Sequence, residues 1–159
     1  MEQCYSVEYT IMKCLIVSVG KEKTGDVDDA ILMFSNRILR YAPLEWYYIP
    51  SLATKEKEGE KILGILKKED YVILLDERGS ELTSESVAEL IENRMVDGAK
   101  RVVFIIGGAY GVSKDIHTRA NYTWKLSSLV FPHALVRLIL AEQIYRAFTI
   151  IKGEPYHHA

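Results

Sequence analysis

A glycine-rich segment in the second half of the chain is the first candidate for chemistry. Residues 102–106 read Val-Val-Phe-Ile-Ile, and Gly107-Gly108-Ala109-Tyr110-Gly111 follows them directly. Ligands of parallel α/β sheets bind beyond the carboxyl ends of strands, where glycines let the backbone approach a ligand closely. The segment is neither the GxGxxG dinucleotide fingerprint nor a P-loop. Taken alone, a tight strand-to-helix turn is therefore the simpler interpretation.

Charged residues follow a second apolar run, Tyr-Val-Ile-Leu-Leu at 71–75. Paired carboxylates can perform acid–base catalysis, but Asp76 and Glu77 are immediate neighbours. The sequence Asp-Glu-Arg-Gly at 76–79 is more typical of a solvated turn. We therefore expect the backbone of Leu75, at the strand tip, to be the more important group.

The C-terminal part of the chain holds the remaining polar candidates. Pro132-His133 opens an apolar helix expected over 133–151, in which Glu142 and Arg146 have the i, i+4 spacing of a structural ion pair. The tail Tyr156-His157-His158 could bind a metal, contact RNA or be an unstructured terminus. The sequence has no zinc-ligand spacing, GxSxG motif or Cys/His nucleophile pattern, so we expect no metal site.

Apolar strands alternate with two-sided helices along the chain and would position these residues. The patterns predict strands at 12–19, 44–49, 71–75 and 102–106, helices at about 27–40, 53–68, 83–97 and 133–151, and a helical stretch after Ser113. This alternation predicts an α/β protein with a mainly parallel sheet and helices on both faces. The segment 121–131 is neither a clean strand nor a clean helix.

The length and composition fit a single domain. The chain has 159 residues, of which 48% are hydrophobic and 26% are charged, which excludes disordered, collagen-like and coiled-coil classes. Two cysteines make no disulfide framework, and we find neither a signal peptide nor a membrane-spanning run, so a cytoplasmic location is expected. Residues 1–11 read as an N-terminal extension to one domain at 12–159, with Met12 as an alternative candidate for the first residue.

The net charge of -2 hides an uneven distribution along the chain. Residues 1–99 carry 12 Lys and Arg against 19 Asp and Glu, a net of -7, whereas residues 100–159 carry 8 against 3, a net of +5. Such asymmetry fits either a face that meets an anion or ordinary surface charge that happens to segregate.

Taken together, the motifs resemble those of a known family. The matching segments are Leu-Ile-Val-Ser-Val-Gly-Lys at 15–21, Lys-Glu-Gly-Glu at 57–60, Phe-Ile-Ile-Gly-Gly-Ala-Tyr-Gly at 104–111, Trp-Lys-Leu-Ser at 124–127, Phe-Pro-His at 131–133, Arg137, Ala-Glu-Gln-Ile-Tyr-Arg-Ala at 141–147 and Pro-Tyr-His at 155–157. They resemble the small bacterial SPOUT-class methyltransferases that methylate N3 of a pseudouridine in large-subunit ribosomal RNA. The likeness spans residues 12 to 158. Family members usually carry Lys or Arg where this chain has His158.

This resemblance implies a fold, a cofactor and an oligomeric state. The fold would be an α/β domain with a C-terminal trefoil knot, a rare exception to the usual connection rules. S-adenosylmethionine would bind in the knot and contact Leu75, Gly107, Leu126, Ser127, Ser128, Leu129, Val130 and Phe131. The family works as a homodimer in which the C-terminal helices pack together and the partner's tail helps to complete the site.

The resemblance also implies the chemistry, which is transfer of the sulfonium methyl group to N3 of the pseudouridine. It further implies that the RNA is recognised largely by its shape, on assembled ribosomes. The catalytic residues expected from the resemblance are His133, Glu142, Arg146, Tyr156 and His157. The first and last of these, or a water held near Glu142, are candidates for the base. Arg146 and Arg137 could instead hold phosphate. The alternatives are another RNA target, such as transfer RNA, and a non-catalytic module that binds RNA or nucleotides.

Overall fold

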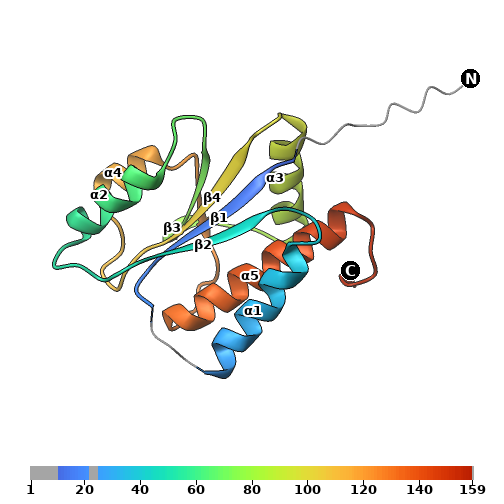
Figure 1. Ribbon diagram of the computed structural model, residues 1–159, viewed down its shortest axis with the longest axis horizontal. Helices are drawn as coiled ribbons and strands as arrows, with labels where there is room; N and C mark the ends of the chain where they lie inside the picture. Colours follow the sequence, from blue (N-terminus) through green and yellow to red (C-terminus); the bar gives the residue numbers. More distant parts are fainter. Residues whose placement is uncertain (1–10, 22–24, 159) are drawn as a thin grey trace, which may run out of the picture.

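A single parallel sheet organises the chain, and Figure 1 shows it between helices. The computed structural model describes residues 11–21 and 25–158, so residues 1–10 of the predicted extension lie outside the described part. The elements are β1 (Lys13–Val19), α1 (Asp26–Ile38), β2 (Leu44–Ile49), α2 (Lys55–Ile65), β3 (Tyr71–Glu81), α3 (Ser84–Val96), β4 (Arg101–Ile106), α4 (Lys114–Arg119), β5 (Tyr122–Lys125) and α5 (His133–Ile151). The sheet order is β2-β1-β4-β3-β5, and the neighbouring strands pair in parallel. The predicted parallel α/β architecture is confirmed.

The inner strands β1 and β4 are buried on both faces, which explains their continuous apolar sequences. Every residue after Lys13 in β1 and after Arg101 in β4 is buried. In register, Ile16 of β1 and Ile73 of β3 lie on either side of Phe104. Strands covered by helices on both sides show no polar alternation, so apolar runs predicted them correctly.

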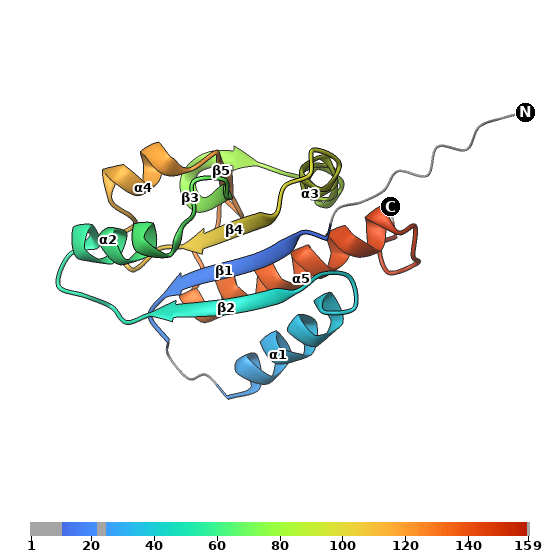
Figure 2. The same cartoon turned by 45° about the horizontal axis from the view of Figure 1, so that its top comes forward.

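Helices cover both faces of the sheet, and each face has its own hydrophobic core. One core joins the strands to α1, α3 and α5, and includes Ile38, Ile91 and Phe148. The other core lies on the opposite face and includes Ile62 of α2 and Ile116 of α4. Figure 2 shows α2 and α4 on one side of the sheet and α1 and α5 on the other. The prediction of helices on both faces is confirmed.

The far edge of the sheet differs from the prediction. The residues expected to form a turn at 76–79 belong to β3, which continues to Glu81, and residues 122–125 form β5. The two strands pair from Ile73 to Glu81 with an irregularity between Leu75 and Ser80. A Cβ atom on Gly79 would lie 2.5 Å from the carbonyl oxygen of Thr123, so the glycine permits this close approach.

The helix α5 connects the two ends of the molecule. It packs against both α1 and α3. Figure 2 shows it running from the end where β1, β2 and β4 terminate to the opposite end, where the C-terminus lies. Within the described residues, no helix has the length and apolar character needed to cross a membrane.

Candidate functional site

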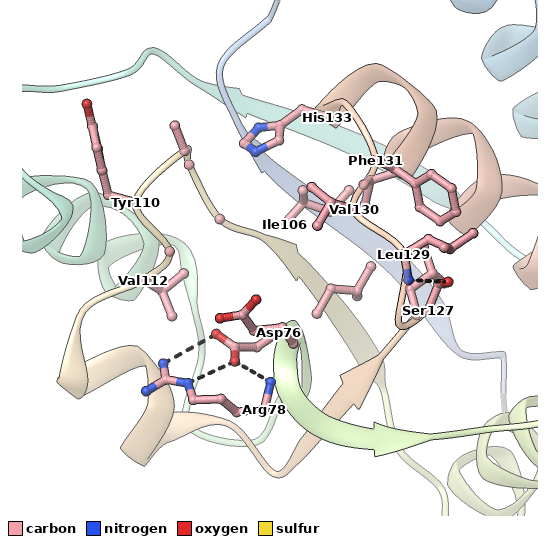
Figure 3. Close-up of a pocket in the computed structure, with 18 residues that line it drawn as sticks. Asp76, Arg78, Ile106, Tyr110, Val112, Ser127, Leu129, Val130, Phe131 and His133 are labelled. Atoms are coloured by element: carbon pink, nitrogen blue, oxygen red, sulfur yellow. Dashed lines mark hydrogen bonds and ion pairs between the residues drawn. The ribbon is translucent and has the colours of Figure 1, made fainter.

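A cavity of about 570 Å³ lies at the carboxyl ends of the central strands. Its walls come from three segments: 75–78 in β3, 106–112 after β4, and the stretch between β5 and α5. His133 and Val136 of α5 complete the lining. Figure 3 shows Val112 and Arg78 on one side of the cavity and Phe131 and Ser127 on the other. The position matches the place where parallel α/β sheets bind ligands.

The glycine segment forms the tight turn predicted from the sequence, and it also lines this cavity. The amide of Gly111 donates a hydrogen bond of 3.0 Å to the carbonyl oxygen of Gly108, and Gly111 has a φ of +80°. A Cβ atom on Gly107 would lie 2.6 Å from Cγ1 of Val112. One on Gly108 would lie 3.0 Å from Oε2 of Glu58. Packing behind the turn therefore leaves no room for larger residues, and the backbone faces the cavity.

Most residues expected to bind the cofactor line the cavity. They are Leu75, Gly107, Leu126, Ser127, Leu129, Val130 and Phe131. Ser128 is not part of the lining, because its hydroxyl donates a 2.7 Å hydrogen bond to Oε1 of Glu81. The hydroxyl of Ser127 instead accepts a hydrogen bond from the amide of Leu129, which holds the segment in its curved path.

Asp76 lines the cavity, so the prediction of a solvated turn residue at this position is wrong. Its side chain is 9% exposed and is not a solvated turn group. The backbone amide and Nε of Arg78 donate to Oδ1 at 2.9 and 3.1 Å, and His117 of α4 lies 3.5 Å from Oδ2. Burial alone would raise the pKa of Asp76, but the hydrogen bonds from Arg78 outweigh it and hold the pKa below its ordinary value. Residues i and i+2 of a strand share a face, so a prediction that extended this strand past Leu75 would have placed Asp76 and Arg78 side by side.

A second polar cluster lies at the other end of α5. Its hydrogen bonds join Arg146 to Oε1 of Glu142 at 2.6 and 3.0 Å, Tyr156 to the same oxygen at 3.0 Å, Arg146 to Nδ1 of His157 at 3.2 Å, and Nε2 of His157 to Glu85 at 2.8 Å. The predicted ion pair between Glu142 and Arg146 is confirmed. We call these five residues the tail cluster.

The electrostatics of the tail cluster follow from its contacts. Burial, followed by the hydrogen bond to Glu142, raises the pKa of Tyr156. The hydrogen bond with Glu142 raises the pKa of Arg146, and the hydrogen bond with His157 lowers that of Glu85. The shifts favour a neutral hydroxyl on Tyr156, a charged guanidinium on Arg146 and a charged carboxylate on Glu85.

One chain does not bring the five expected catalytic residues together. His133 is the first residue of α5 and lines the cavity. Arg146 lies thirteen positions further along the same helix, which corresponds to roughly 20 Å at 1.5 Å per residue. Arg137, expected to contact phosphate, is 2% exposed and lies inside the molecule. Among the described residues, no group of three or more His, Cys, Asp or Glu is placed to hold a metal ion.

Comparison with known proteins shows the family of this chain. The family model described as predicted SPOUT methyltransferase matches residues 12–157. The chain is 42% identical over 156 residues to the ribosomal RNA large subunit methyltransferase H of Christiangramia forsetii, covering 92% of this chain and 99% of that protein. It is 44% identical over 158 residues to the protein of the same name from Clostridium beijerinckii, with the same coverage.

Two solved structures show the same fold at low sequence identity. A probable methylase family protein from Haemophilus influenzae superposes with a TM-score of 0.59 and 10% identity, covering 92% of this chain and 69% of that one. The tRNA (m1G37) methyltransferase from Aquifex aeolicus gives 0.52 and 12%, covering 93% and 75%. The fold class is thus the predicted one, an α/β protein with a parallel sheet and helices on both faces. The chain belongs to the SPOUT methyltransferase family, in the group of ribosomal RNA large subunit methyltransferases H.

Proposed function

We propose that this protein uses S-adenosylmethionine to methylate N3 of a pseudouridine in large-subunit ribosomal RNA. It would act as a cytoplasmic homodimer on assembled ribosomes, through a single domain at 12–159. The observation that carries the proposal is the cavity at the strand ends. It is built from the segments 75–78, 106–112 and 126–131, in a chain that is 42% identical to a large-subunit ribosomal RNA methyltransferase over nearly its whole length.

The residues that line the cavity fit S-adenosylmethionine. Apolar side chains of Leu75, Ile106 and Phe131, with exposed backbone between them, suit a flat and neutral nucleoside. Charged groups at 76–78 suit the amino-acid end of the same molecule. The cofactor supplies an activated methyl group, which passes to the acceptor nitrogen as the S–C bond breaks and leaves a neutral thioether. The protein therefore mainly has to position donor and acceptor.

His133 is the expected catalytic residue that this chain itself places at the cavity. The N3 proton of the acceptor must leave as the new N–C bond forms, and an imidazole nitrogen can accept it directly or through one water. Pro132 is the N-cap residue of α5 and directly precedes His133, so the imidazole is placed at the start of the helix. We assign His133 the role of general base in this proposal.

The distance between the cavity and the tail cluster supports a site shared by two chains. Glu142 and Arg146 lie along α5 away from His133, and Tyr156 and His157 of the tail that follows α5 are hydrogen-bonded to them, so none of the four is among the residues that line the cavity of their own chain. Exposed apolar side chains lie on α5 and on its neighbour α1, at Leu135, Leu32 and Met33. A homodimer that buries this surface would bring the partner's tail cluster towards the cavity.

A methylation assay with labelled donor tests the proposed function. Ribosomes, naked large-subunit RNA and transfer RNA from a strain that lacks the enzyme are incubated with it, and the modified nucleoside is identified by mass spectrometry. We expect label on a pseudouridine of the ribosomal RNA, with ribosomes as the better substrate. Label on transfer RNA would support the alternative target. Binding of donor without transfer to any of the three would support a non-catalytic module.

A further inference from the structure

The cavity has one strongly charged edge, formed by residues 76–78 at the end of β3. Among the described residues that line the cavity, Arg78 is the one Lys or Arg. The remaining lining is apolar or glycine over most of its extent, apart from the neighbouring carboxylates, Tyr110, Ser127 and His133. A guanidinium keeps its positive charge at every physiological pH, so a bound anion would find a permanent partner here.

Neighbouring side chains fix the orientation of the Arg78 guanidinium. Its Nε donates to Oδ1 of Asp76 at 3.1 Å, and Nη2 lies 3.4 Å from Oδ2. Nη2 also contacts Nε2 of His117, which must be the acceptor because a guanidinium can only donate. Figure 3 shows the bonds to Asp76. One edge of the guanidinium is thus held by the protein.

The other edge of the guanidinium is available to a ligand. Nη1 makes no hydrogen bond with any residue in the described part of the chain. The Arg78 side chain is 67% exposed, although the Asp76 carboxylate beneath it is nearly buried. An arginine oriented by one carboxylate and presenting a free edge is preorganised for a second carboxylate, since little side-chain entropy remains to be lost on binding.

We propose that Arg78 binds the carboxylate of the amino-acid end of S-adenosylmethionine, and that Asp76 and His117 position its guanidinium for this contact. The inference rests on the proposed function, because it assumes that this cofactor occupies the cavity. The nucleoside would lie on the apolar side, near Leu126 and Phe131, and the amino-acid end would extend to the charged edge. A phosphate of the RNA is the competing partner for Arg78.

Calorimetry with two ligands that differ in their amino-acid end tests the contact. S-adenosylhomocysteine carries the carboxylate, whereas 5′-methylthioadenosine has the nucleoside and thioether but no amino-acid end. Arg78→Gln should weaken binding of S-adenosylhomocysteine by about tenfold, as expected for a charge-assisted hydrogen bond at a partly exposed site. Binding of 5′-methylthioadenosine should stay within about twofold. Arg78→Lys should lose an intermediate amount, because lysine keeps the charge without the planar fork.

Two further variants separate positioning from general structural damage. His117→Leu removes the acceptor for Nη2 and should weaken only the ligand with the carboxylate, and His117→Gln, which restores an acceptor, should recover most of that loss. Arg40→Gln removes an exposed arginine in the turn after α1 and should change neither affinity.

The outcomes distinguish this inference from the proposed function. If the unaltered protein binds neither ligand, the cofactor assignment fails, and the inference fails with it. If both ligands bind but Arg78→Gln weakens them equally or not at all, the carboxylate contact is wrong while the cofactor assignment stands. Unchanged ligand affinity together with weaker ribosome binding would assign Arg78 to an RNA phosphate.

Discussion

His133 links the cavity to the chemistry proposed for it. The residue begins α5 and lines the cavity that Leu75 and Gly107 also line. If its imidazole accepts the N3 proton, His133→Ala should lower kcat by about 100-fold or more, since a positioned base contributes that much. Binding of S-adenosylhomocysteine should be nearly unchanged in the same variant, as measured by calorimetry.

The other histidine expected to act as the base, His157, is the alternative that this experiment tests. His157 pairs with Glu85 and Arg146 and lies far from the cavity of its own chain. A His133→Ala protein that keeps full kcat, with a pH profile like that of the unaltered protein, would remove His133 from the base role. His157 would then be the next candidate.

Gly107 has no space for a side chain, so a substitution there tests the role of the glycine turn. A Cβ atom would lie 2.6 Å from Val112 Cγ1 and 3.3 Å from the backbone of Gly111. Val112 is β-branched and has few alternative rotamers, so Gly107→Ala should displace the glycine turn. We expect a loss of about 1–2 kcal/mol in the free energy of unfolding and weaker binding of S-adenosylhomocysteine.

Gly64→Ala is the matched control for Gly107→Ala. Gly64 lies inside α2, and a Cβ atom there would have no neighbour within 4 Å. Alanine has the higher helix propensity, so this variant should be more stable by about 0.5–1 kcal/mol and should bind the ligand unchanged. Equal effects of the two substitutions on ligand binding would contradict the steric argument for the glycine turn.

At the scale of elements, the sequence predicted what depends on local pattern and missed what depends on pairing. The strands at 12–19, 44–49 and 102–106 were found because apolar runs end at glycine or proline. The extension of β3 was missed because residues 76–79 have the composition of a turn, and only pairing with β5 keeps them extended. β5 was missed because it is short and its partner lies about fifty residues earlier in the chain.

The same division applies to the candidate site. Seven of the residues that the family resemblance gave for cofactor binding line the cavity, because the short motifs that carry the resemblance lie in the segments that form it. The contact between Arg78 and His117 was not predicted, since the two residues are 39 positions apart and meet only when α4 packs beside β3. A motif also does not tell whether its residues converge within one chain or across two, and in this chain the motif residues of the tail cluster lie apart from the cavity-lining His133.

An ion pair at the amino-terminal ends of β3 and β4, opposite the strand ends that line the cavity, also contacts the end of α2. Arg101 contacts both carboxylate oxygens of Asp70, at 2.9 and 2.5 Å, and also the carbonyl oxygen of Ile65 at 3.1 Å. The Asp70 side chain is 1% exposed. Asp70→Asn would leave the guanidinium without its counter-charge and should cost about 2–4 kcal/mol in the free energy of unfolding, measured by urea denaturation.

The acid dependence of stability gives that prediction a second readout. Burial alone would raise the pKa of Asp70, but hydrogen bonds from Arg101 and the Lys67 amide lower it below its ordinary value. In the unfolded chain the carboxyl of Asp70 takes up its proton at a higher pH than in the folded chain. Its contribution to the free energy of unfolding is therefore complete above about pH 5 and is lost as the pH falls through the lowered pKa of the folded state. Asp70→Asn should remove this part of the pH dependence. Asp97→Asn, at an exposed surface pair with Arg94, should change stability by less than about 0.5 kcal/mol.

At the scale of the whole molecule, the charge asymmetry of the sequence does not become a simple basic face. Arg101 pairs with Asp70, Lys125 lies 3.5 Å from Glu81, and Arg146 pairs with Glu142. Arg119 donates hydrogen bonds to backbone carbonyl oxygens. Much of the positive excess after residue 100 is thus engaged in contacts within the chain, and Arg101 and Lys125 pair with acidic residues of the first part. The interpretation as segregated surface charge and the interpretation as an anion-binding face both overlooked this internal pairing.

A site shared between two chains predicts complementation between two inactive variants. His133→Ala damages the cavity side, and Arg146→Gln damages the tail cluster, so each homodimer should be nearly inactive. When the two proteins are unfolded together and refolded as a mixture, about half of the dimers are mixed, and each mixed dimer has one site that carries neither substitution. Methyl transfer should recover to about a quarter of the unaltered level, with light scattering confirming that all samples are dimers. If both residues acted within one chain, every site in the mixture would carry one lesion and no activity would return. That result would contradict the shared site while leaving the fold and the cofactor cavity intact.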